Sequence, residues 1–365
     1  MTFPSLRTAD DCVSSPPGSS LEPVIVRRLE KKDTDRWDRF VFAQPDGTFF
    51  HQVSWMRVLE RTFGHQSQYA YAERDGSMVG IVPTFLVSNW MVGRALISSP
   101  LASYGGICAS DPAAERALLE FLKVQAKEQK VDYLELRNQE GEVKPQFVAN
   151  PLYSDFSMSL AGSSDEVLNA LPKDIRYMIR KAKKADLQIK RGPEYLDVFY
   201  HLFRINMHRL GTPVFPRALF ANLLSEFGKQ VDVLIVYAGS QPVASAFSFL
   251  FRDTMHPYYI GGLPLARDLA ANNFLWWELI KFAVEAGMKT FDFGRSKKGT
   301  GAYAFKKKWN PEIKDLKYQV FLVRRTTAPN FSPANPKFKA ATQIWSHMPL
   351  WLANILGPKV VSWLP

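Results

Sequence analysis

The segment MKTFDFGRSKKGTGAYAFKKKWN, residues 288–310, decides the fold and places its chemistry. Within it, residues 289–293 alternate aromatic side chains with smaller or polar ones, which predicts a short buried strand. Gly294 ends this strand, and Gly299 and Gly301 follow closely, so the backbone can approach a ligand. Because ligands of α/β proteins gather at the carboxyl ends of strands, the segment predicts a binding site that begins where the strand ends.

The two halves of the chain repeat one order of elements around that segment. The first copy has a hairpin, a glycine-containing segment, a helix and a strand, at 68–87, 104–109, 112–129 and 131–137. The second copy has the same order at 231–251, 259–264, 265–286 and 290–295. The hairpin predicts antiparallel strands, and the strand after the helix predicts a parallel pair. The expected fold is therefore α/β (α+β), with two tandem domains that each have a mixed sheet flanked by helices.

The excess of basic residues indicates what kind of molecule the protein binds. The 365-residue chain has 46 Lys and Arg against 35 Asp and Glu, a formal net charge of +11. Such a balance favours an anionic partner: a nucleic acid, a nucleotide-linked substrate or a membrane surface. Two cysteines and six scattered histidines provide neither a disulfide framework nor the spacing of a metal site. The cysteine count predicts a reducing compartment, and we expect a cytoplasmic protein.

A basic helix is predicted between the two copies, in LPKDIRYMIRKAKKADL (171–187). Arg176, Arg180 and Lys184 form one row at i, i+4 spacing, and Tyr177 belongs to the neighbouring row. A row of like charges repels itself unless an anion lies against it. The row therefore predicts either phosphate binding by Arg176, Tyr177, Arg180 and Lys184, on a helix that faces a cleft between the two domains, or an ordinary solvated basic surface.

Several motifs together resemble the FemAB-like transferases, a family with two domains of the GNAT acyltransferase fold in one chain. They are PDGTFFHQVSWMRVLERTFGH (45–65), the 171–187 segment, LGTPVFP (210–216), YYIGGLPLARDLAANNFLWWELI (258–280) and DFGRSKKGTGAYAFKKKWN (292–310). The chain is identified as a member of the branch associated with exosortase (PEP-CTERM) and exopolysaccharide systems. The resemblance covers residues 24–360. It implies transfer of an acyl group to nitrogen, because characterised members move an amino acid from aminoacyl-tRNA to an amine of a peptidoglycan precursor.

The resemblance also implies site residues. A Phe-Lys pair contributes to the transferase site of the family, and the matching pair here is Phe305 and Lys306. Lys306 would bind the developing oxyanion or a donor phosphate, and Phe305 would stack on a base or ribose. Asp292 would accept the amine proton, with pairing to Arg295 or capping of the next turn as the alternative. The remaining candidates for substrate binding are Tyr259, Arg295, Lys297, Lys298 and Tyr303.

Three functions follow from these residues. The first is an acyl or aminoacyl transferase that forms an amide on an amine of a cell-envelope or exopolysaccharide precursor. The second is an acyl-CoA-dependent N-acyltransferase, although GGLPLARDLAANN (261–273) lacks the second close glycine of a pyrophosphate-binding turn. The third is a non-enzymatic scaffold of an envelope assembly system. We expect no tightly bound cofactor and no metal; aminoacyl-tRNA or acyl-CoA would be the anionic donor.

The expected boundaries are a disordered leader (1–22), an N-terminal domain (23–160), a C-terminal domain that includes the basic helix (161–327) and an amphipathic tail (328–365). The tail holds many large apolar residues interrupted by Pro349 and Pro358. It is compatible with packing onto the domains or with lying in a membrane interface. The second alternative would place the protein at the inner face of the membrane.

Overall fold

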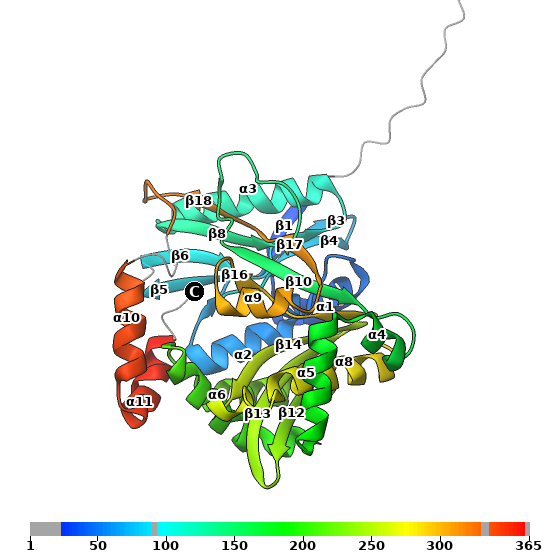
Figure 1. Cartoon of the computed structure of the whole chain (residues 1–365). Coiled ribbons are helices and arrows are strands. Elements are labelled where there is room, and N and C mark those ends of the chain that lie inside the picture. Colours follow the sequence, from blue (N-terminus) through cyan, green and yellow to red (C-terminus); the bar gives the residue numbers. More distant parts are fainter. Residues whose placement is uncertain (1–22, 90–92, 330–335, 362–365) are drawn as a thin grey trace, which may run out of the picture.

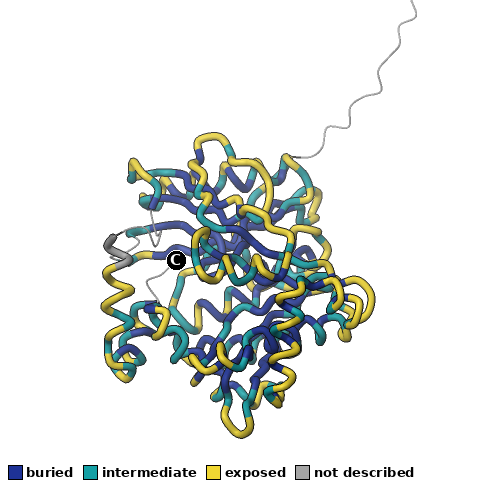
Figure 2. Tube along the Cα trace, in the orientation of Figure 1, coloured by how far each residue is buried: buried dark blue, intermediate teal, exposed yellow. Residues whose placement is uncertain are grey.

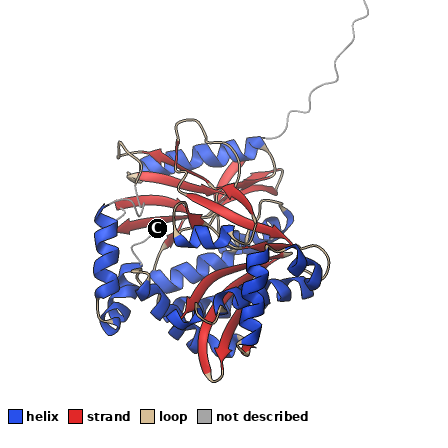
Figure 3. Ribbon diagram, viewed as in Figure 1, coloured by secondary structure: helices blue, strands red, loops and turns tan. Residues whose placement is uncertain are grey.

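The computed structural model describes residues 23–89, 93–329 and 336–361, in which strands form three sheets and helices cover their faces (Figure 1, Figure 3). The expected leader, 1–22, lies outside the described residues. The first sheet has the order β1-β3-β4-β7, with strands Ile25–Arg28, Ala70–Arg74, Ser77–Val82 and Cys108–Ala109. The second has the order β2-β5-β6-β8-β18-β9, with strands Gln66–Ser67, Thr84–Asn89, Gly93–Ser98, Tyr133–Asn138, Lys317–Leu322 and Val148–Ala149.

The third sheet belongs mainly to the second half of the chain. Its order is β11-β12-β13-β14-β15-β10-β16, and β17 pairs with β10. These strands span Leu187–Arg191, Val231–Ala238, Gln241–Phe251, Thr254–Gly262, Thr290–Asp292, Tyr153–Ser159, Ser296–Lys297 and Glu312–Asp315. The strand expected at 289–293 is therefore present as β15.

The helices of the first half are α1 (Thr34–Ala43), α2 (Val53–Phe63) and α3 (Pro112–Glu128). Those of the second half are α4 (Ser164–Ala170), α5 (Lys173–Lys184), α6 (Leu196–Arg209), α7 (Arg217–Phe227), α8 (Ala271–Glu285) and α9 (Gly301–Lys307). The tail forms α10 (Pro336–His347) and α11 (Leu350–Val361). Short 3-10 helices occupy Lys31–Asp33, Phe49–His51, Pro193–Tyr195, Gly228–Gln230 and Pro264–Ala266. None of the described helices is long and apolar enough to cross a bilayer.

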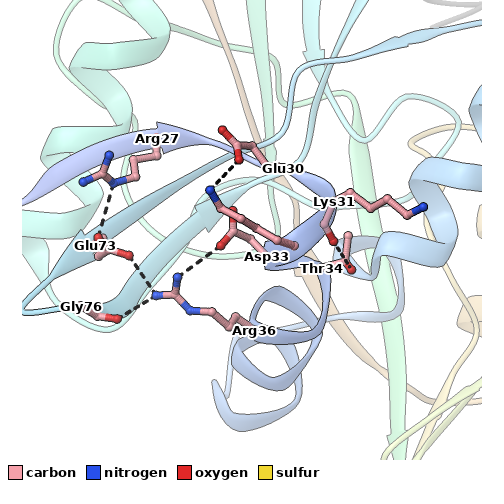
Figure 4. Close-up of polar contacts among 9 residues, drawn as sticks. Arg27, Glu30, Lys31, Asp33, Thr34, Arg36, Glu73 and Gly76 are labelled. Carbon is pink, nitrogen blue, oxygen red and sulfur yellow. Dashed lines mark hydrogen bonds and ion pairs between the residues drawn. The ribbon is translucent and has the colours of Figure 1, made fainter.

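The repeat predicted from the sequence is confirmed in its central unit. β6 and β8 are parallel and joined through α3, and β14 and β15 are parallel and joined through α8. The predicted hairpin turn is also present, because Asp75 and Gly76 both have positive φ between β3 and β4. Arg36 of α1 fastens this hairpin by donating to the Glu73 carboxylate and the Gly76 carbonyl (Figure 4).

Three expected elements differ in extent. The second strand of the hairpin expected at 68–87 is divided between two sheets at Pro83, which cannot donate to a ladder. The glycine-containing segment expected at 104–109 forms a strand only at its end, as β7. The helix expected at 265–286 begins at Ala271, after a 3-10 turn at Pro264–Ala266.

The two halves exchange strands, so the boundary expected at residue 160 does not separate their sheets. β10, which precedes that boundary, pairs with β15 in the third sheet. β18, which follows it, pairs with β8 in the second sheet. The core is shared in the same way: Phe49 stacks on Phe227 and on Phe249 with ring centroids 4.1 Å apart in each pair. Figure 2 shows buried segments in both halves of the molecule.

Candidate functional site

A cavity of about 800 Å³ lies where β14 and β15 separate. The two strands are hydrogen-bonded in parallel only at Thr254–Thr290 and Met255–Phe291. Beyond Met255, β14 continues to Gly262, whereas the chain after β15 stays beside β10, with which both β15 and β16 pair. Both sides of the resulting wedge line the cavity, with residues 256–263 on one side and 293–297 on the other. The wedge is thus an opening built into the sheet, at the carboxyl end of β15, where the sequence predicted a site.

His256 enters this wedge from β14 and is 5% exposed. Its Nδ1 lies 3.4 Å from Oδ2 of Asp292, while its Nε2 is buried without a hydrogen-bond partner among the described residues. Burial lowers the pKa of His256 below 6.5, although the nearby Asp292 acts in the opposite direction. The ring is therefore neutral at pH 7. The adjacent carboxylate favours a proton on Nδ1, which leaves the lone pair of Nε2 available as a proton acceptor.

Asp292 is held from both halves of the molecule. Tyr104, in the loop before β7, donates its hydroxyl to Oδ2 of Asp292 at 2.6 Å, and the backbone N–H of Gly294 donates to Oδ1 at 2.6 Å. Burial and the charge of Asp292 keep the pKa of Tyr104 well above its usual range, so the phenol stays a donor. Asp292 itself is 3% exposed and is not among the residues that line the cavity. Its carboxylate therefore faces His256 rather than the open space.

Gly294 is required at the end of β15 for two reasons. Its φ is +74°, a conformation that costs L side chains energy. A Cβ built on it would also lie 2.7 Å from Nε2 of His256. The glycine therefore keeps the space in front of the unpartnered imidazole nitrogen open.

Lys306 approaches the same point from the last turn of α9. Its Nζ donates to the carbonyls of Gly294 and Arg295 at 2.8 and 3.1 Å. Burial lowers the pKa of Lys306 to about 8, although Asp292 and Asp155 act in the opposite direction. For Asp155, burial and the charge of Asp292 raise the pKa well above its usual range. At pH 7 the cluster then contains a charged lysine beside a neutral imidazole.

The turn of α9 is fixed by capping and by aromatic packing. The Thr300 hydroxyl accepts from the Tyr303 N–H at the start of the helix. Phe305 and Trp309 lie at i, i+4 spacing, and Trp309 is fully buried with its ring 6.0 Å from that of Phe293. This packing carries Phe305 and Lys306 to the cavity wall.

Arg295 supplies a second positive charge. Its guanidinium stacks over the Tyr153 ring at 4.6 Å and donates to the Tyr318 hydroxyl at 2.6 Å. The Tyr318 hydroxyl donates in turn to the Ser103 carbonyl. Within the described ranges Arg295 forms no ion pair. An anionic group entering the cavity would meet this uncompensated charge together with Lys306.

The structure brings five of the predicted site residues to the cavity: Tyr259, Arg295, Lys297, Phe305 and Lys306. Asp292 lies behind the wall, and the alternative role as a cap for the following turn describes its bond to Gly294. No bond joins it to Arg295. Tyr303 and Lys298 do not line the cavity; Lys298 forms an ion pair with Asp315 at 2.8 Å.

The basic helix does not reach the cavity either. Arg176, Tyr177, Arg180 and Lys184 lie on α5, which packs against α8, and none of them is a lining residue. We expected this helix to face the cleft. It instead turns its apolar row, Ile175, Ile179 and Ala182, to the core, so Tyr177 is 61% exposed on the outer surface.

Sequence reasoning missed His256, Tyr104, Asp155 and Tyr318. Tyr104 belongs to the repeated glycine segment, where it corresponds to the candidate Tyr259. This correspondence was the one signal in the sequence that could have identified it. His256 stands in a strand whose pattern gives no indication of the opposing carboxylate. Asp155 and Tyr318 come from the exchanged strands β10 and β18, and the repeat did not predict that exchange.

Part of the chain matches a known protein family, and most of it superposes on solved structures. Residues 170–307 match the family described as acetyltransferase (GNAT) domain. FemX has a structure that superposes with a TM-score of 0.62 at 15% identity, over 82% of this chain and 98% of FemX. No curated protein matches the chain.

Two further structures share the fold. The C-terminal domain of a putative lysylphosphatidylglycerol synthetase from Agrobacterium fabrum gives a TM-score of 0.54 at 13% identity, over 80% of this chain and 92% of that domain. A tandem GNAT protein from the clavulanic acid biosynthesis pathway, solved without AcCoA, gives 0.53 at 9% identity, over 84% and 99%. The predicted tandem GNAT fold is thereby confirmed. With the domain match, the chain is an acyltransferase, and acyl-CoA in such enzymes is a substrate rather than a tightly bound cofactor.

Proposed function

We propose that this protein transfers an acyl or aminoacyl group to an amine, with His256 as the base that receives the amine proton. The observation that carries the proposal is the buried, unpartnered Nε2 of His256 in the wedge cavity, backed by Asp292. An amine becomes a nucleophile only after it loses a proton, and a neutral imidazole is suited to accept one near pH 7. Asp292, given the role of base in the sequence analysis, is better placed to orient His256.

The positive groups would stabilise the transition state. As the amine nitrogen attacks the carbonyl carbon, negative charge develops on the carbonyl oxygen. Lys306 has two carbonyl acceptors and therefore one remaining N–H to direct at that oxygen. The new C–N bond replaces the ester or thioester bond, the amine proton passes to Nε2 of His256, and the leaving oxygen or sulfur takes a proton in turn.

The donor and acceptor are inferred from the resemblance to FemAB-like transferases. We propose aminoacyl-tRNA as the donor and an amine of a cell-envelope or exopolysaccharide precursor as the acceptor. The shared fold with FemX and with a lysylphosphatidylglycerol synthetase domain supports transfer to envelope components. Arg295, Lys297 and Lys306 at the cavity suit an anionic donor end. Arg176, Arg180 and Lys184 on the exposed face of α5 suit more distant phosphates.

Acyl-CoA is the second candidate donor, favoured by the match of residues 170–307 to the acetyltransferase (GNAT) domain. The glycines before α8 have another task, however. A Cβ on Gly261 would lie 2.6 Å from the backbone nitrogen of Phe203, so this glycine permits close packing of α6 on β14. The 261–273 segment then continues into a 3-10 turn at Pro264–Ala266. This arrangement weakens the case for a pyrophosphate cradle there.

Competition between donors tests the proposal. Purified protein would be titrated with charged tRNA, acetyl-CoA and a long-chain acyl-CoA at several salt concentrations, and transfer of label to an amine would be followed. We expect tRNA binding that weakens steeply with salt and label that moves from the aminoacyl end. Saturable acyl-CoA binding with acyl transfer and no tRNA preference would establish the second candidate. Absence of transfer from every donor would contradict the proposal.

A pair of charge-reversal variants separates α5 from the cavity. Arg180→Glu with Lys184→Glu is expected to reduce the affinity for tRNA and to flatten its salt dependence, with little change in transfer from a small donor. Lys130→Glu with Lys229→Glu is the matched control, because both lysines are exposed away from α5. Equal losses in the two double variants would assign the effect to net charge alone.

A further inference from the structure

The tail packs on the molecule and still leaves one apolar face uncovered. On α11 the inner row, Ala353, Gly357 and Val361, is buried against the body. Gly357 permits the close approach, because a Cβ there would lie 2.9 Å from the Val214 backbone nitrogen. The Met348 carbonyl is bonded to Nε2 of His208 at 2.7 Å. The tail is thus anchored at the end of α6, as the packing alternative predicted.

The opposite row of α11 points outward. Trp351 and Ile355 are 66% and 57% exposed, and Ile344 of α10 is 68% exposed. Leu210, at the end of α6, is 51% exposed. These four residues, here called the tail patch, lie on neighbouring elements, because α10 and α11 both contact α6 and Gly211 lies directly against Thr342 of α10. Isolated exposed apolar residues are ordinary, but a group this large on one corner indicates a binding surface.

Charge identifies the partner of the tail patch. The helices α10 and α11 contain Lys337, Lys339 and Lys359 and no Asp or Glu. A tryptophan and isoleucines on a segment free of acidic groups fit the interface of an anionic lipid bilayer, where apolar side chains enter the acyl boundary and basic ones meet the headgroups. The helices are too short to span the bilayer, so they would lie on its surface.

The tail patch also adjoins the cavity. Leu210, Gly211 and Thr342 all line the cavity, so its rim on this side is formed by α10 and the end of α6. α10 and α11 occupy the edge of the molecule opposite α4 and α5 in the view of Figure 1, and much of α10 is exposed in Figure 2. We infer that the tail patch docks the protein on an anionic membrane surface, with the cavity rim held next to the lipid headgroups.

This docking would bring a lipid-carried amine to the wedge, and that consequence alone rests on the proposed function. Docking itself is measurable without any transfer. The two proposals can therefore fail separately: loss of transfer with intact docking contradicts the first, and intact transfer without docking contradicts the second.

Sedimentation with vesicles tests the inference on the full chain. Vesicles of phosphatidylcholine with about one third phosphatidylglycerol would be compared with pure phosphatidylcholine. We expect binding to the anionic vesicles that falls as salt rises, and a partition coefficient at least about tenfold lower for Trp351→Ala with Ile355→Ala. Val124→Ala with Ile189→Ala is the matched control, because Val124 and Ile189 are 51% and 41% exposed on α3 and β11. The control should bind as the wild type does.

Transfer to a water-soluble amine should be unchanged in both double variants, which confirms that they fold. Three results would overturn the inference. The first is wild-type protein that does not bind anionic vesicles. The second is binding of these vesicles by the Trp351→Ala, Ile355→Ala variant that equals binding by the wild type. The third is a dimer in analytical ultracentrifugation that Trp351→Ala with Ile355→Ala dissociates, since a second copy would then cover the tail patch.

Discussion

The wedge in the second half is built on the strand pair β14 and β15, and the pair β6 and β8 is its counterpart in the first half. The two units have the same topology but differ in the charged residues near the end of the second strand. Each unit consists of a strand, a helix and a second strand parallel to the first. An arginine lies near the end of each second strand: Arg137 within β8 and Arg295 shortly after β15. Arg137 is 3% exposed and pairs with Glu135 at 2.7 Å. The position that corresponds to Glu135 holds Phe293, so Arg295 has no carboxylate partner in the described part of the chain.

Under the proposed function, this difference makes the second copy the reactive one and gives the first copy a supporting role. In the first half the buried ion pair is complete, and Arg137 also donates to the carbonyls of Ser99 and Ala102. In the second half the acid has moved one residue earlier, to Asp292, where it faces His256 instead of the arginine. The first half still contributes Tyr104 to that acid. Single substitutions in the wedge, each compared with a matched substitution elsewhere, should separate the two copies.

Replacing the proposed base should have the largest effect. His256→Gln keeps a hydrogen-bonding side chain beside Asp292 but cannot accept a proton, so kcat should fall by about 10²- to 10⁴-fold. His65→Gln is the matched control. His65 also has a buried, unpartnered Nε2, and burial lowers its pKa to about 4, but it lies outside the cavity with no carboxylate beside it. Transfer kinetics that fall equally in both variants would refute the special role of the second wedge.

Filling the space in front of the imidazole should come next. Gly294→Ala brings a Cβ against Nε2 of His256 and forces a positive φ on alanine, so kcat should fall on the order of 10²-fold. Gly299→Ala provides the comparison. Gly299 has a similar φ of +77°, but a Cβ there meets nothing within 4 Å. Gly299→Ala should lose about 1 kcal/mol of unfolding free energy, measured by denaturant titration, and Gly294→Ala should lose more because its Cβ also meets His256. The kinetic loss should be confined to Gly294→Ala.

The charge of Lys306 should determine the alkaline side of the pH profile. Its pKa of about 8 means that the cation is present below that pH and is lost as the pH rises through it. By pH 9 about one tenth of the lysine is charged, so the rate should be roughly tenfold below its maximum. Lys306→Arg should move this alkaline limb upward, because arginine stays charged. Lys307→Arg should leave the profile where it is; a limb unaffected by Lys306→Arg would exclude Lys306 as its source.

Removing the hydrogen bond that Tyr104 of the first half donates to Asp292 should have the smallest effect on kcat. Tyr104→Phe deletes the hydrogen bond to Asp292 while keeping the ring, so kcat should fall by about three- to tenfold. The acid limb of the pH profile should shift as well, because the interaction between Asp292 and His256 changes. Tyr69→Phe is the control, since Tyr69 is a buried tyrosine of the first half whose hydroxyl has no partner. A uniform loss without a shifted limb would reduce Tyr104 to a structural role.

Local pattern was sufficient to predict most of the elements. Alternation and helical spacing located the two strand–helix–strand units, and the segment 288–310 does contain a short strand followed by a helix that carries Phe305 and Lys306. The tandem fold followed from the order of elements in both copies.

What pattern could not predict depends on long-range pairing. β10 and β18 exchange between the halves, and this exchange brings Asp155 and Tyr318 to the site. His256 and Asp292 meet across a strand pair that separates after two residue pairs, a divergence with no local signature. The charge row on α5 suggested a cleft-facing surface, but its apolar residues decide its orientation and place the charges outside.

The most direct measurement is the tautomer and pKa of His256 by nitrogen NMR of the imidazole groups, assigned through the His256→Gln variant. We predict a neutral ring at pH 7 with the proton on Nδ1 and a free Nε2, titrating below 6.5. His65, which lacks a carboxylate neighbour, provides the internal comparison for burial alone. A proton on Nε2, or a ring charged at pH 7, would contradict the assignment of His256 as the base of the reactive wedge.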